Sequence, residues 1–256
     1  MKAERFFIGW SGKTGPELGR FLALVAGGLV VGMGLAGFLL GAGADDPAAG
    51  LLGLAPPERV APSVPEGREL RGVLDPGPYP ILRLAPTPER PQGEAMLMSG
   101  FGKDGVAVDP ELYGRPVAVR GTVFARGDVS MLTTDGRFTP LDEPAAPAPA
   151  AEPLGRWRIA GELCDGKCYA GVMRPGSGLA HRACAALCFV GEVPLIFVAA
   201  EAVGGSAFMV AADADGGPPP DAARALIGVP VALEGSLERR GTLLIFRVDF
   251  DRARLL

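Results

Sequence analysis

The fold is decided by the stretch Gly114-Arg-Pro-Val-Ala-Val-Arg-Gly-Thr-Val-Phe-Ala-Arg-Gly127, which recurs without a gap as Gly228-Val-Pro-Val-Ala-Leu-Glu-Gly-Ser-Leu-Glu-Arg-Arg-Gly241. In both stretches apolar and polar residues alternate up to an Arg-Gly pair, and a second apolar segment follows. Alternation on both sides of a glycine turn predicts a β-hairpin. Residues 70–75 and 159–164 form a similar pair earlier in the chain. The sequence therefore predicts a tandem duplication of one β unit.

Other short apolar segments complete each predicted unit. We expect further strands at residues 69–74, 79–84, 94–101, 156–163, 195–200 and 207–212. Short helices are expected at residues 110–114 and 221–228, since each segment ends at a glycine. Four or five short strands with a small helix before the last hairpin are typical of a small Greek-key barrel of the OB type. The predicted fold class is mostly β, with a transmembrane helix followed by two tandem OB-like barrels; a generic β-sandwich is the alternative.

The composition excludes several classes of protein. With 38 Gly and 25 Pro in 256 residues, the chain is a poor candidate for a helical bundle. Its 48% hydrophobic residues argue against disorder, and a single His leaves little scope for His-based catalysis, so no catalytic residue is assigned. The formal net charge of −4 predicts no nucleic-acid partner.

An uncharged apolar run, residues 21–43, is long enough to cross a bilayer as a helix. Residues 1–20 carry four basic and two acidic side chains, so this N-terminal segment is expected to be cytoplasmic and the bulk of the chain periplasmic. Ala42-Gly43-Ala44 resembles a signal-peptidase site, but the run exceeds an ordinary signal sequence. We therefore expect an uncleaved single-pass anchor in a bacterial inner membrane.

The apolar run also carries small residues at helical spacing. The steps Gly28 to Gly32 and Gly37 to Gly41 would let a second helix approach closely. This spacing predicts self-association or a membrane-protein partner. Glycine is also common in transmembrane helices that have no such partner.

Two segments rich in Ala and Pro divide the remainder. Residues 44–65 are expected to form a tether above the membrane, and residues 143–154 a linker. They delimit a first β domain at residues 66–142 and a second at residues 155–256. Between matching landmarks the second copy is 25 residues longer, which predicts an insert within about residues 164–194.

The insert holds the only His and all four Cys of the chain, and Cys164 is its first residue. A helix is expected over residues 179–190, which would place His181, Cys184 and Cys188 on one face. The preceding loop, rich in glycine, could fold Cys164 and Cys168 back onto that face.

Three interpretations of this group remain open. Two disulfides, nested as Cys164–Cys188 and Cys168–Cys184, would suit an exported protein. Alternatively the thiols and His181 bind zinc or copper, with Met173 as an extra ligand. Thiol–disulfide exchange is the third interpretation, although the chain lacks a CxxC motif.

The segment Cys164-Asp-Gly-Lys-Cys-Tyr, with His181-Arg-Ala-Cys-Ala-Ala-Leu-Cys188, resembles a motif of uncharacterised bacterial membrane-anchored proteins. This resemblance supports the expected location and implies no activity. From the residues we expect a membrane-anchored accessory or binding protein that assists metal handling or electron transfer in a membrane complex. A metal-dependent or thiol-redox enzyme and a disulfide-stapled interaction module are the alternatives.

Overall fold

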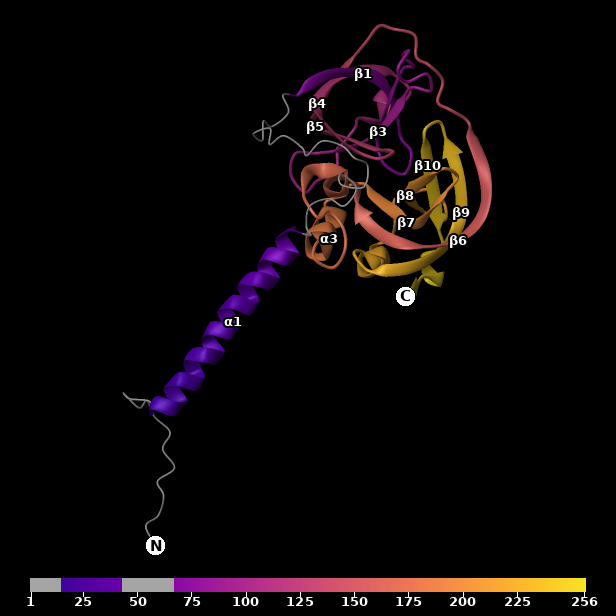
Figure 1. The fold of residues 1–256 in the computed structure, drawn as a ribbon. Helices are drawn as coiled ribbons and strands as arrows, with labels where there is room; N and C mark the ends of the chain where they lie inside the picture. The colour runs from indigo at the N-terminus through magenta and orange to yellow at the C-terminus, as the bar shows by residue number, and fades with distance from the viewer. Residues whose placement is uncertain (1–14, 43–66) are drawn as a thin grey trace. The chain divides into compact units, whose positions relative to one another are not determined.

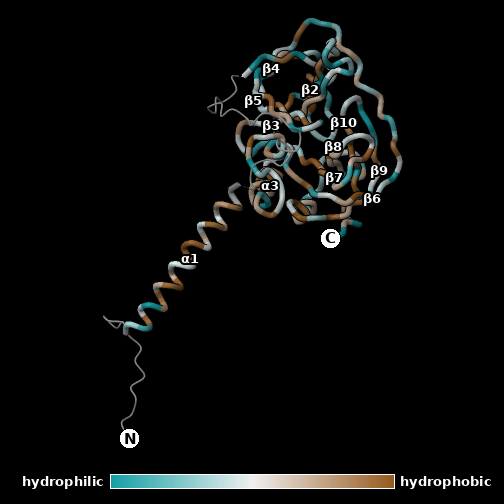
Figure 2. Tube along the Cα trace, in the orientation of Figure 1, coloured by the Kyte–Doolittle hydropathy of each residue, from teal (hydrophilic) through white to brown (hydrophobic). Residues whose placement is uncertain are grey.

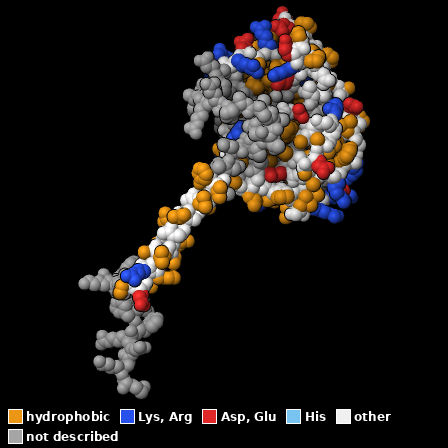
Figure 3. Space-filling view, viewed as in Figure 1, with side chains coloured by type: hydrophobic (Ala, Val, Ile, Leu, Met, Phe, Trp, Pro, Cys, Tyr) orange, Lys and Arg blue, Asp and Glu red, His pale blue; other side chains and the backbone are white. Residues whose placement is uncertain are grey.

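The N-terminal helix α1 (Pro16–Ala42) is the first element of the computed structural model, which describes residues 15–42 and 67–256 (Figure 1). Proline suits the first turn of a helix, because its missing N–H would have no partner there. Beyond Arg20 the helix is almost entirely apolar, and its charges lie at its N-terminal end (Figures 2 and 3). Residues 16–39 are long and apolar enough to span a membrane.

The helix leaves its glycines open. Among the described residues, a Cβ added at Gly28, Gly32 or Gly37 would meet no atom within 4 Å outside the nearby helix backbone. The side-chain surroundings of Gly41, the predicted tether at residues 44–65 and residues 1–14 lie outside the described residues. α1 is a unit of its own, separate from the β-rich remainder.

The first sheet consists of β1 (Arg68–Asp75), β2 (Ile81–Leu84), β3 (Glu94–Ser99), β4 (Pro116–Arg126) and β5 (Val129–Pro140). The strands pair in the order β1-β2-β3-β5-β4, and β4 pairs back with β1, so the pairing closes on itself. Only the β3–β5 pair of this sheet is parallel. The hairpin predicted at Gly127 is the antiparallel pair of β4 and β5.

The second sheet consists of β6 (Ala151–Asp165), β7 (Leu195–Val203), β8 (Ser206–Asp213), β9 (Pro230–Arg240), β10 (Leu243–Val248) and the short β11 (Arg254–Leu255). Its first five strands repeat the pairing order of the first sheet, and the β8–β10 pair is parallel as the β3–β5 pair is. β6 begins within the stretch expected as a linker, because its N-terminal part pairs with β9. The described chain is thus mostly strand, in two sheets, with an apolar N-terminal helix.

A short helix precedes the last hairpin in both sheets, as the sequence predicts. These are the 3-10 helices η1 (Pro110–Leu112) and η3 (Asp221–Leu226). After each helix comes a glycine with positive φ, Gly114 at 77° and Gly228 at 70°. Their backbone N–H groups donate to Leu74 O at 2.8 Å and to Leu163 O at 3.0 Å. The repeated glycines therefore donate the same backbone hydrogen bond to the first strand of each sheet.

The two sheets share a hydrophobic core. The first two residues of β2 and nearly all of β3 are buried on both faces, which explains why these strands are mostly apolar rather than alternating. Leu82 and Leu132 point into the first sheet, whereas the neighbouring Ile81 and Met131 pack in a cluster with Ile196 and Phe197 of the second. Both sheets consequently belong to one compact unit.

Candidate metal centre

The insert lies between β6 and β7 and contains two short helical segments. A single helical turn, η2 (Cys168–Val172), follows the end of β6, and the helix α3 (Arg182–Val190) precedes β7. The sequence predicts α3 but starts it at residue 179, so that His181 would lie on the helix. In the structure His181 precedes the first residue of α3. The turn η2 lies in a stretch expected to be loop.

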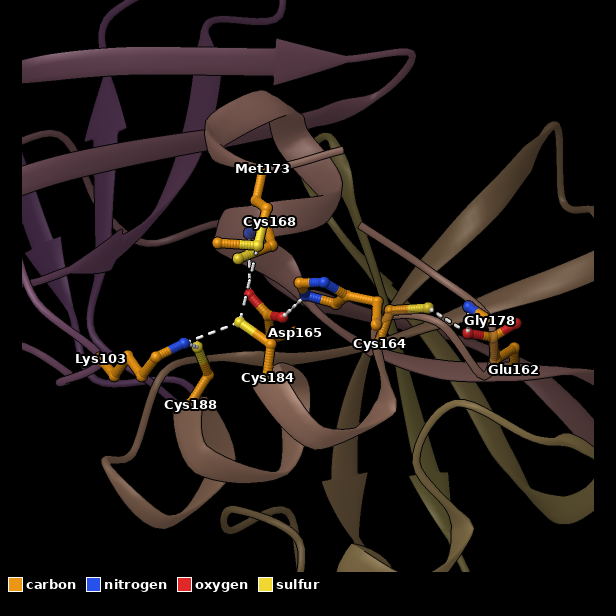
Figure 4. Close-up of polar contacts among 10 residues, drawn as sticks. Lys103, Glu162, Cys164, Asp165, Cys168, Met173, Gly178, Cys184 and Cys188 are labelled. Atoms are coloured by element: carbon orange, nitrogen blue, oxygen red, sulfur yellow. Dashed lines mark hydrogen bonds and ion pairs between the residues drawn. The ribbon is translucent and has the colours of Figure 1, made fainter. Parts of the chain in front are cut away.

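Three thiols meet where η2 packs beside α3. The sulfur atoms of Cys168, Cys184 and Cys188 all lie within 4.8 Å of one another, and we call these residues the thiol cluster. Cys168 and Cys188 are buried, while Cys184 is partly exposed. The thioether sulfur of Met173 lies 3.8 Å from Cys184 Sγ, and its side chain extends toward the cluster beside Cys168 (Figure 4). The three sulfurs of the thiol cluster and the nearby sulfur of Met173 therefore come from two segments of the insert.

A lysine of the first sheet reaches the thiol cluster. Lys103 follows β3, and its Nζ donates to Cys184 Sγ at 2.7 Å and lies 4.0 Å from Cys188 Sγ (Figure 4). The hydrogen bond to Cys184 raises the pKa of Lys103 above its ordinary value. The ammonium group thus places a positive charge directly beside two sulfurs.

The thiols of Cys168 and Cys188 are electrostatically unequal. A hydrogen bond from the Cys168 thiol lowers the pKa of Cys188, and the charge of Lys103 lowers it further. The same hydrogen bond, together with burial, raises the pKa of Cys168. Cys188 is therefore the first of the pair to become a thiolate, which is the form that binds metals and attacks disulfides.

The segment that carries Lys103, residues 100–105, is held by the insert and is called the Lys103 loop. Lys167, which is buried, donates from Nζ to the carbonyl oxygens of Gly100 and, at 2.7 Å, Gly102. Gly105 N donates to Gly191 O at 2.6 Å. A Cβ added at Gly191 would lie 1.7 Å from the carbonyl oxygen of Lys103, so only glycine fits this contact.

A buried pair, Asp165 and His181, lies beside the thiol cluster. His181 Nε2 is 2.8 Å from Asp165 Oδ2, and the side chains are 2% and 0% exposed. The other carboxylate oxygen accepts the backbone N–H of Cys168 at 2.7 Å. Ligand atoms of Asp165, Cys168 and His181 also lie within 4.8 Å of one another. The pair thus orients Cys168 and forms a second group that shares this thiol.

Cys164 lies apart from the other three cysteines. Its thiol donates to Glu162 Oε1 at 3.2 Å, an oxygen that also accepts the Gly178 N–H at 2.5 Å (Figure 4). Burial raises the pKa of Cys164. All four cysteines are free thiols, so neither disulfide of the nested pairing is present. The structure thus brings together Cys168, Cys184, Cys188 and Met173, places His181 at the edge of this group, and leaves Cys164 outside.

Lys103, Asp165 and Lys167 contact the site but were not assigned to it from the sequence. Lys103 lies in the glycine-rich segment Gly100-Phe-Gly-Lys-Asp-Gly105, which precedes the second half of the first sheet. Its role depends on a contact between residues 81 positions apart, for which the sequence gives no signal. Comparison of the chain with protein-family models, with curated proteins and with solved structures finds no match in any of the three.

Proposed function

We propose that this chain is a membrane-anchored accessory protein that binds one thiophilic metal ion at the thiol cluster. The observation that carries the proposal is the meeting of Cys168, Cys184 and Cys188 within 4.8 Å as free thiols. Cys thiolates bind zinc and Cu(I), and a metal–sulfur bond of about 2.3 Å in a tetrahedral site separates neighbouring sulfurs by about 3.8 Å. The cluster is compact enough to reach this spacing through small side-chain rotations.

Local contacts support a site rather than a chance meeting of cysteines. Asp165 fixes the backbone of Cys168, while Lys103 donates to Cys184 and offsets thiolate charge. Such outer contacts orient metal ligands and tune their affinity. Two further ligands are at hand, the thioether of Met173 and the imidazole of His181.

The proposed location follows from α1 and its flanking charges. The helix is of spanning length, and the basic excess of residues 1–20 favours a cytoplasmic N-terminus. We propose that α1 is an uncleaved anchor in a bacterial inner membrane and that the β unit is periplasmic. Its exposed glycine steps would serve self-association or a membrane-protein partner.

We also propose that both sheets are OB-like barrels that arose by duplication. The support is their common order of pairings, with one parallel pair and a short helix before the closing hairpin. This order suits a five-stranded Greek-key barrel. The site then belongs to the connection between the first two strands of the second barrel.

Thiol–disulfide exchange is the second candidate function, and the lowered pKa of Cys188 favours it. The Cys188 thiolate would attack a disulfide of a partner protein, and Cys168 would resolve the mixed disulfide. The partner would leave with two thiols, and the chain would keep one disulfide.

The test is to purify the full chain in detergent without chelator, then measure bound metal and free thiols. We expect one metal ion per chain. Cys184→Ser should abolish binding, whereas Cys164→Ser, a matched change in a cysteine outside the cluster, should leave it intact. Four titratable thiols without affinity for any metal would refute the proposal. Absence of both thiols and metal would favour the disulfide module, and a reversible two-electron titration would favour exchange.

A further inference from the structure

We propose that the ion is cuprous copper, bound by Cys168, Cys184 and Cys188 with the thioether of Met173 as fourth ligand. This inference rests on the proposed function and adds the identity of the ion and of its last ligand. It gives Met173 a specific role as the residue that selects Cu(I) over Zn(II).

The position of Met173 carries the inference. Its sulfur lies 3.8 Å from Cys184 Sγ, which matches the separation of about 3.8 Å expected between two sulfur ligands of one tetrahedral ion. Figure 4 shows the side chain of Met173 directed at the cluster from above Cys168. Met173 is also 45% exposed, so no packing against a core explains this direction.

The chemistry of a thioether discriminates between the two metals. Zinc sites in proteins are built from thiolate, imidazole and carboxylate ligands. A neutral, polarizable thioether is a soft ligand, which Cu(I) accepts. Three thiolates and one thioether therefore form a sulfur-only set that favours the softer ion.

The imidazole that would complete a zinc site of three Cys and one His is placed less favourably. His181 Nε2 pairs with the buried carboxylate of Asp165, and among the described residues His181 groups with Cys168 but not with all three thiols. A zinc ion that took His181 as its fourth ligand would require the buried pair to move. Cuprous ion needs no change in His181, which then acts through Asp165 and the backbone of Cys168.

Lys103 favours metal binding at the thiol cluster but does not discriminate between Cu(I) and Zn(II). Its ammonium offsets one negative charge whether the cluster holds Cu(I) or Zn(II). Both ions would also reach the thiol cluster from the same side, because Met173 and Cys184 are at least partly exposed while Cys168 and Cys188 are buried. The ion would enter past Met173, and its binding would release the protons of thiols that are still protonated.

The experiment compares Cu(I) and Zn(II) binding to the reduced full chain in detergent, by competition with a chromophoric chelator for each metal. Met173→Leu keeps the apolar volume and removes the thioether. We expect it to weaken Cu(I) binding by about tenfold or more and to leave Zn(II) binding unchanged. His181→Gln removes the partner of Asp165 but no copper ligand, so it should weaken Cu(I) binding less than Met173→Leu does.

X-ray absorption of the metal-loaded wild type gives a readout that needs no variant, which matters because His181 is buried. Sulfur-only scattering around copper is the expected result. Nitrogen in the first shell, or a Met173→Leu variant with unaltered Cu(I) affinity, would overturn the inference while leaving metal binding intact. Binding of neither metal would instead refute the proposed function.

Discussion

The two β sheets share one order of strand pairings but differ most in the connection between their first two strands. Five residues, 76–80, join β1 to β2, whereas residues 166–194 join β6 to β7 and carry the thiol cluster. The second sheet accommodates this insert without altering its pairings. The comparison shows that the strands provide a scaffold and that the cysteines of the thiol cluster all lie in one connection.

The corresponding strand ends sharpen the contrast. Leu74 and Leu163 accept equivalent backbone bonds, so the residues that follow them, Asp75 and Cys164, are counterparts. Asp75 is buried and ion-paired with Arg83 at 2.5 Å. Cys164 is a residue of the strand rather than of the insert, which explains why it lies outside the thiol cluster. Conversely, the first sheet supplies Lys103, so the site is not confined to the second copy.

The largest expected effect concerns the shared core. Met131→Ala removes a buried side chain between the sheets, and Leu132→Ala removes its neighbour inside the first sheet. Each change should lower the free energy of unfolding by about 2–5 kcal/mol. Because the sheets share a core, both variants should unfold in one transition. The measurement is denaturant unfolding of the full chain in detergent.

Two probes would show whether the sheets unfold together. Fluorescence of Trp157, which lies on β6, reports on the second sheet in a background carrying Trp10→Phe, while circular dichroism reports on both sheets. Coincident curves for Leu132→Ala are expected. If this variant shifted circular dichroism but left the Trp157 transition in place, the sheets would be independent domains.

The next effect concerns the contact between the Lys103 loop and the insert. Gly191→Ala places a Cβ against the Lys103 carbonyl oxygen, where Gly191 now leaves just enough space. Forcing the loop away should destabilise the chain by about 1–3 kcal/mol and lower its metal affinity, since Lys103 loses its position. Thermal unfolding and metal competition would measure both effects, with the exposed Ala183→Gly as a control on α3. A stable variant with full affinity would mean that the loop contact does not position Lys103.

Much of the fold was accessible from the sequence because it depends on local patterns. Both hairpins, both short helices and the insert between matched strands follow from alternation, glycine turns and an internal repeat. β3, which is buried on both faces, was predicted at residues 94–101 and is found at Glu94–Ser99, but its sequence could not show that the two sheets pack against each other. That each sheet is an OB-like barrel remains a proposal, since it depends on the complete order of strand pairings rather than on any local pattern.

The site was only partly accessible. Helical spacing placed Cys184 and Cys188 correctly on one element, and the loop brought Cys168 to them. The same reasoning drew in Cys164, because four cysteines within 25 positions suggest one group unless the strand register is known. Lys103 could not be found, since its contact spans the two copies of the repeat.

Lys103→Gln should give the smallest effect and tests the contribution of the first sheet most directly. The charge of Lys103 lowers the pKa of Cys188, so a neutral side chain should raise this pKa, and thiolate absorbance near 240 nm should appear at higher pH in the metal-free chain. Added salt should act in the same direction, because Lys103 is exposed and its charge is screened. Cys188→Ser should lack this rise in absorbance, and its absence would assign the rise to Cys188. If Lys103→Gln left the titration of Cys188 at the same pH, the insert alone would determine the pKa of Cys188. The first sheet would then contribute nothing to the site.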